Sequence, residues 1–155
     1  MKDLQLQLDL AFGCIASDGE VAAVELDCLK SICIQRGVAA EDYHASLQKT
    51  QQKFQQDMTS LYDAVVSELG EMRNDFDRQL DIMEILIELV VSDGVVDQGE
   101  LSFLRFVILA GRWDANALRQ AKPEWAQYIQ DGFDTPLELR SKVMAKMNEG
   151  IQAQN

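Results

Sequence analysis

Two acidic segments of the chain repeat one spacing of residues and are its best candidates for chemistry. Residues 17–25 read SDGEVAAVE and residues 92–100 read SDGVVDQGE, so Ser-Asp-Gly-x-Val-x-x-x-Glu recurs after 75 residues. The pattern has the glycine, the core-facing valine and the final glutamate of the second half of a calcium-binding EF-hand loop. The candidate ligands for a divalent cation are the repeated acids Asp18, Glu25, Asp93 and Glu100.

Both segments lack the first half of an EF-hand loop. Counted back from the final glutamate, the first and third ligand positions hold Cys14 and Ala16 in one copy, and Leu89 and Val91 in the other. Apolar side chains at these positions cannot bind a hard cation, so neither segment is a complete EF-hand. A cation site would need carboxylates from both copies, brought together by pairing of the two units. Carboxylates without histidine or cysteine suit Ca²⁺ or Mg²⁺ better than zinc.

The same acids also have structural explanations. Asp97 and Glu100 have the N-cap and N3 spacing of a capping box. Asp18 and Asp93 can each close an Asx-type turn, with the next glycine at positive φ. The residues alone leave both explanations open. A further row of acids with helical spacing is typical of a solvated face: Asp77, Asp81, Glu84 and Glu88.

The segments around each acidic turn are predicted to be helices. LQLQLDL at residues 4–10 alternates like a strand, but a shift of 75 residues aligns this region with MEILIELVVSDG, which belongs to a segment too long for a strand. After each turn, apolar residues recur with helical spacing as far as Gly37 and Gly111. We therefore expect two helix-turn-helix units, at about 4–37 and 79–112, which superpose as internal repeats and pack together.

The segment between the units is expected to form two helices, at about residues 40–55 and 58–69, with a break near Gln56–Asp57. Asn74 and Asp77 have capping-box spacing and are expected to open the second unit.

The C-terminal extension, residues 113–155, is also expected to be helical. A short helix is predicted at about 114–121, and a last helix from Pro136 to Gly150, because proline is well tolerated in the first helical turn. Trp113 and Trp125 are expected to be buried anchors that fasten this extension to the rest of the protein.

Length and composition fit one soluble domain over residues 1–155. The helical patterns along the chain predict that this domain is all-α, a bundle of about seven or eight helices with no strand. No apolar run approaches the roughly 18–20 residues of a membrane span, and the N-terminus lacks the apolar core of a secretory signal, so we expect a cytoplasmic protein. The net charge is −12, and the first hundred residues hold 20 acids against 7 bases. This charge repels phosphate backbones, and we expect no nucleic-acid partner.

No catalytic constellation appears in the sequence. There is no nucleophile–base pair, phosphate-binding loop or cofactor fingerprint, and His44 is the only histidine. Cys14, Cys28 and Cys33 form no CxxC pair and are expected to be reduced, mostly buried thiols. A site made of acids alone offers no reacting group, so we expect a protein that is not an enzyme.

Over about residues 4–112, the chain resembles the TerB-like family of bacterial tellurite-resistance proteins. The resemblance is carried by two segments, IASDGEVAAVELDCLKSI and ILIELVVSDGVVDQGELSFLRFV. The resemblance implies an all-helical bundle of two related halves, whose turn acids bind metal. It also implies a part in resistance to tellurite and other stresses, alongside membrane-linked partners. Two functions follow as expectations. One is divalent-cation binding combined with protein contacts, and the other is a metal-independent interaction module whose acidic surface docks a basic partner.

Overall fold

The chain folds into seven α-helices and one short 3-10 helix, with no strand in the part that the structure describes. The structure is a computed structural model that covers residues 3–17, 19–92, 94–132 and 134–154, with the backbone alone for 153 and 154. The elements are α1 (Leu4–Ala16), α2 (Ala23–Gln35), α3 (Ala40–Glu71), α4 (Phe76–Val91), α5 (Gln98–Gly111), α6 (Ala115–Ala121), the 3-10 helix Pro123–Trp125 and α7 (Pro136–Gln154). The all-α prediction is confirmed.

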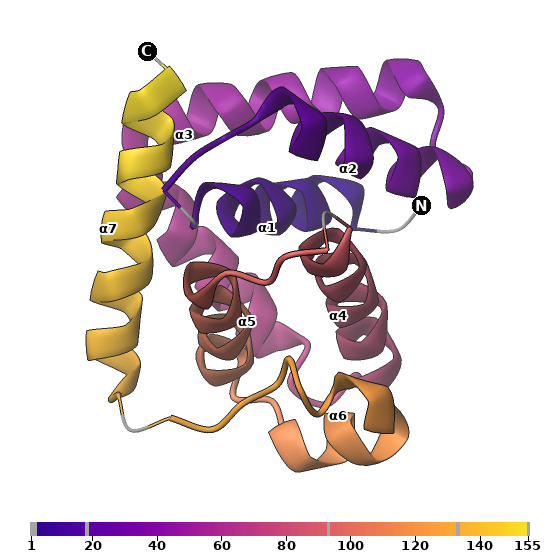
Figure 1. Cartoon of the computed structure of the whole chain (residues 1–155), viewed down its shortest axis with the longest axis vertical. Coiled ribbons are helices and arrows are strands. Elements are labelled where there is room, and N and C mark those ends of the chain that lie inside the picture. The colour runs from indigo at the N-terminus through magenta and orange to yellow at the C-terminus, as the bar shows by residue number, and fades with distance from the viewer. Residues whose placement is uncertain (1–2, 18, 93, 133, 155) are drawn as a thin grey trace.

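Helix α1 lies at the centre of the bundle (Figure 1). Helices α3, α4, α5 and α7 pack against it, and all its residues from Leu6 to Ala16 are buried. At about 100° per residue, Leu4 and Leu8 lie on one side of the helix and Leu6 and Leu10 on nearly the opposite side, and Leu6, Leu8 and Leu10 are all buried. A helix that is buried on all sides needs no polar face. Its sequence therefore lacks the one-sided apolar pattern of a surface helix and can resemble the alternating pattern of a strand.

Helices α1–α2 and α4–α5 form two helix-turn-helix units, and α1 contacts both helices of the second unit. The two turns share one side-chain hydrogen bond. In each, the serine hydroxyl donates to the carbonyl three residues before it, at 2.5 Å for Ser17 and 2.7 Å for Ser92. Gly19 and Gly94 both have positive φ, 88° and 77°, as predicted. The superposition of the complete units stays a prediction.

Two predicted helix ends are displaced by one residue. Gly37 follows α2 with φ 86°, but after α5 the left-handed residue is Arg112, with φ 57°, and not Gly111. The first turn of α4 is capped by Asp75 rather than by Asn74, and the Asp75 carboxylate accepts the backbone N–H three residues later.

Helix α3 contains the predicted break. Asp57 has φ −157° and ψ 87°, far from helical values, and interrupts the helix there. Its carboxylate accepts the backbone N–H of Ser60 at 3.1 Å and the Ser60 hydroxyl at 2.7 Å, so it caps the second half of α3. The bent helix contacts both α1 and α5.

The C-terminal extension is fastened to the bundle by buried side chains. Trp113 and Trp125 are each 6 % exposed, as predicted, and the Trp113 indole N–H donates to the carbonyl of Leu69 at 3.0 Å. Helix α7 runs to Gln154, beyond its predicted end, and flanks α5 and the end of α1 (Figure 1). Within the described residues, no helix is both long and apolar enough to cross a membrane.

Candidate functional site

The structure describes two of the four predicted cation ligands, Glu25 and Glu100. Asp18 and Asp93 lie outside the described residues. Both glutamates occupy the third position of the helix that follows their turn, α2 for Glu25 and α5 for Glu100. Glu25 is half-buried and Glu100 is 5 % exposed. The described part of the chain contains no group of three or more histidine, cysteine or acidic side chains placed to hold a metal ion.

Glu100 completes the predicted capping box. Its Oε1 accepts the backbone N–H of Asp97 at 3.2 Å, and the Asp97 carboxylate accepts the N–H of Gly99 at 2.6 Å. The structural role predicted for this pair of acids is therefore confirmed. In the first unit the N-cap is Ala22, which has no side-chain oxygen, so the reciprocal box cannot form at Glu25.

The end of α1 packs directly on the start of α5. A Cβ atom added to Gly99 would lie 2.1 Å from the carbonyl oxygen of Ser17, so this approach requires glycine. Ser17 begins the first acidic turn, and Glu100 directly follows Gly99 in α5. The first turn and Glu100 therefore come from different units but lie at the same end of α1.

A groove of about 370 Å³ opens beside this contact, between α1, α5 and α7. Ser17 and Gly99 line one side, and Lys146 and Glu149 of α7 line another. A Cβ atom on Gly19 would lie 3.3 Å from Glu149 Oε2, so a further carboxylate stands at the first turn. The sequence did not point to Glu149, because only the packing of α7 brings it to this turn.

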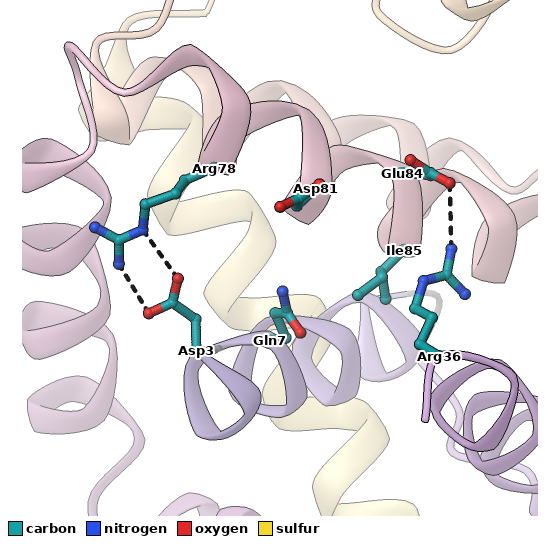
Figure 2. A pocket seen from close by; sticks show the side chains of 7 residues that line it. All are labelled: Asp3, Gln7, Arg36, Arg78, Asp81, Glu84 and Ile85. Carbon is teal, nitrogen blue, oxygen red and sulfur yellow. Dashed lines mark hydrogen bonds and ion pairs between the residues drawn. The ribbon is translucent and has the colours of Figure 1, made fainter. Parts of the chain in front are cut away.

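A second cavity, of about 280 Å³, lies near the start of α1, between α1, the end of α2 and α4 (Figure 2). Arg36 and Arg78 line it, and each is paired with an acid. Arg78 donates two hydrogen bonds to the carboxylate of Asp3, at 2.8 and 3.0 Å, and this pairing raises the pKa of Arg78. Arg36 donates to Glu88 at 2.7 Å. No sequence pattern points to this cavity, because its walls come from three helices.

Two of the three thiols lie in the core of the bundle. Cys14 and Cys33 are buried, as predicted, whereas Cys28 is half-buried. Burial raises the pKa of the Cys33 thiol, and the charge of Arg36 opposes this effect only in part. A raised pKa leaves little of the reactive thiolate at neutral pH.

The model of the family described as tellurite resistance protein TerB matches residues 8–123 of the 155. No curated protein and no solved structure matches the chain. The matched region contains both acidic turns and helices α2 to α6, together with most of α1. The chain therefore belongs to the family of the tellurite resistance protein TerB.

Proposed function

We propose that this protein is a non-enzymatic cation-binding protein of tellurite or stress resistance, which binds Ca²⁺ or Mg²⁺ at its acidic turns and acts through contacts with other proteins. The observation that supports this most directly is the approach of Ser17 to Gly99, which holds the first turn against the helix that carries Glu100. The proposed ligands are Asp18, Glu25, Asp93 and Glu100. All of them offer carboxylate oxygens, which suit these hard ions.

Electrostatics favours an ion at this end of α1. The Glu149 carboxylate adds negative charge beside Gly19, although Lys146 donates to it at 3.4 Å. Carboxylates that gather in one place repel each other, and a bound divalent cation removes this repulsion. At a hundredfold excess over Kd, such an ion stabilises the folded state by about 2.7 kcal/mol.

The test is thermal unfolding in chelator and in millimolar Ca²⁺ or Mg²⁺. We expect the wild-type melting temperature to rise by several degrees with the ion, and Glu25→Gln and Glu100→Gln to remove most of that rise. Glutamine retains an acceptor at N3, so Glu100→Gln removes the charge while keeping the capping box. The control is Glu41→Gln, an exposed glutamate in the first turn of α3, which should leave the rise unchanged.

The capping box of Asp97 and Glu100 favours a second candidate, a metal-independent interaction module. In that case the turn acids cap helices and close turns, and the acidic surface docks a basic partner directly. Identical melting of the wild type with and without ions would exclude the cation site and leave this module as the function. If Glu41→Gln also removes the ion-induced rise in melting temperature, a specific cation site is excluded. The rise would then reflect only the total negative charge of the protein.

A further inference from the structure

A groove of about 420 Å³ lies at the other end of the α5–α7 pair from the acidic turns. The two helices run antiparallel, so the end of α5 lies beside the start of α7 (Figure 1). Val66 of α3 and the buried Phe106 of α5 line the groove. Leu109 and Leu137 also line it, and they are 38 % and 76 % exposed. Leu137 is the most exposed large apolar side chain in the described part of the chain, so the fold leaves this apolar surface uncovered.

The charge of the groove is opposite to that of the whole protein. The net charge of the chain is −12, but two arginines and no acid are found among the described residues that line the groove. Arg140 is paired with Asp63. The side chain of Arg112 is exposed and has no ion pair or hydrogen bond with the residues that the structure describes. The groove therefore offers an apolar surface together with a guanidinium group that the described fold does not use.

Arg112 also has a backbone conformation that arginine rarely adopts. It follows α5 in the left-handed region, with φ 57° and ψ 37°. Glycine or asparagine is usual at this place, because a larger side chain adds steric strain there. The dipole of α5 favours a positive charge at this end of the helix. The dipole does not explain why the charge stands beside exposed leucines, whereas a ligand with both apolar and acidic groups does.

We propose that this groove docks a segment of a partner protein in which a leucine or phenylalanine is flanked by acidic residues. The apolar side chain would pack on Leu109 and Leu137, and a carboxylate would pair with Arg112. Guanidinium binds a carboxylate through two parallel hydrogen bonds, and an exposed apolar patch rimmed by polar groups is typical of a protein-binding surface. The proposal names the partner for the protein contacts of the proposed function and rests on that part of it alone. It needs no cation at the acidic turns.

The surroundings indicate a protein segment rather than a fatty acid or a membrane. A small-molecule pocket encloses its ligand and buries about 70–90 % of the ligand surface. Leu137, in contrast, projects from the protein and is 76 % exposed. The many negative charges of an anionic membrane would be repelled by a protein of net charge −12. A protein segment brings only a few acids to the arginines and can cover both leucines.

NMR titration in chelator and low salt tests the proposal. The probe is an acetylated and amidated peptide, Glu-Glu-Phe-Glu-Glu. We expect saturable shifts of the backbone signals of Leu109, Ala110 and Leu137. The protein as a whole repels this peptide, so its binding requires a local positive site. Replacing the glutamates by glutamine, or the phenylalanine by alanine, should each weaken binding at least fivefold.

Two results of this titration would contradict the proposal. If the groove signals do not shift at millimolar peptide, or if both altered peptides bind as tightly as the probe, the groove does not dock such a segment. If laurate binds more tightly than the probe, the ligand is a lipid-like carboxylate and the partner-protein assignment is wrong. Chelator is present throughout, so a failure here leaves the ion-dependent melting test of the acidic turns unaffected.

Two variants with matched controls locate the binding. Arg112→Asn removes the charge, and asparagine tolerates the left-handed conformation. Leu137→Ala removes an exposed apolar side chain, so both variants should fold like the wild type. Each should weaken peptide binding at least fivefold. The controls are Arg73→Asn, at an exposed arginine outside the groove, and Val24→Ala, at a 69 % exposed valine of α2, and neither should change it. Equal binding by wild type and Arg112→Asn would overturn the proposal.

Discussion

Two polar residues of the buried helix α1 differ in how completely their side chains are paired. Asp9 is 4 % exposed, and its carboxylate accepts hydrogen bonds from Thr50 at 2.6 Å and Gln5 at 3.2 Å, with Lys53 at 3.7 Å. Gln7 lies two residues away, and its Oε1 has no hydrogen-bond partner among the residues that the structure describes. The partners of Asp9 account for its burial within the fold.

At the residue scale, two helical glycines predict opposite effects of the same substitution. A Cβ atom on Gly99 would lie 2.1 Å from the Ser17 carbonyl oxygen, and one on Gly70 meets nothing within 4 Å. Gly99→Ala should therefore force α1 and α5 apart and destabilise the fold by about 1–3 kcal/mol. Gly70→Ala should stabilise it by about 0.5–1 kcal/mol, because alanine has less freedom to lose in the unfolded chain. Urea unfolding of both variants measures the difference.

The Gly99 variant also bears on the acidic turns. If Gly99→Ala unfolds like the wild type, the close approach of Ser17 is not needed by the fold, and the main support for the proposed cation site is lost. A loss of stability confined to Gly99→Ala shows that the approach of the two units is part of the folded core.

At the scale of the elements, the Asp57 cap predicts a pH dependence. Its hydrogen bonds with Ser60 hold the pKa of the Asp57 carboxyl below its ordinary value. A lowered folded-state pKa means that the cap stabilises the fold at neutral pH, and that this contribution is lost as the pH falls through the acidic range toward the folded-state pKa. Asp57→Ala should therefore unfold at lower urea than the wild type at pH 7.

The same comparison at acidic pH provides the internal control. The difference in urea midpoint between wild type and Asp57→Ala should shrink steadily as the carboxyl becomes protonated. A difference that is constant from neutral to acidic pH would show that the charged cap is not what supports the second half of α3.

The sequence-based predictions succeeded where the interacting residues are close together along the chain. The break at Asp57, the Asp97–Glu100 box and the positive φ of Gly19 and Gly94 depend on residues a few positions apart, and all are confirmed. Helix ends were less exact, because neighbouring polar residues compete to be the cap, as at Asp75.

The features that were missed depend on packing between distant segments. Glu149 reaches the first turn only because α7 folds back along α5, and the cavity around Gln7 needs α1, α2 and α4 in place. The strand-like alternation of LQLQLDL is consistent with a helix that is buried on all sides. This interpretation needs the four neighbouring helices of α1, which the local sequence does not reveal.

At the scale of the whole molecule, the core extends beyond the region that the family match covers. That match ends at residue 123, and α7 follows it. Helix α7 nevertheless packs on both α5 and α1. Its fully or almost fully buried side chains are Leu139, Val143, Met147 and Ile151. Burying one such side chain contributes about 1.5–3 kcal/mol before the entropy cost of ordering the helix is subtracted, so these four side chains tie α7 to the core.

Two leucines of α7, two positions apart, test this assignment. Leu139 is 0 % exposed and Leu137 is 76 % exposed. Leu139→Ala should lower the free energy of unfolding by roughly 2–5 kcal/mol, because it removes buried methyl groups and leaves a cavity between α7 and the bundle. Leu137→Ala should change it by no more than about 0.5 kcal/mol, as exposed substitutions do. Equally small effects in chemical denaturation would mean that α7 does not belong to the core, and then Glu149 would not stand at the first acidic turn.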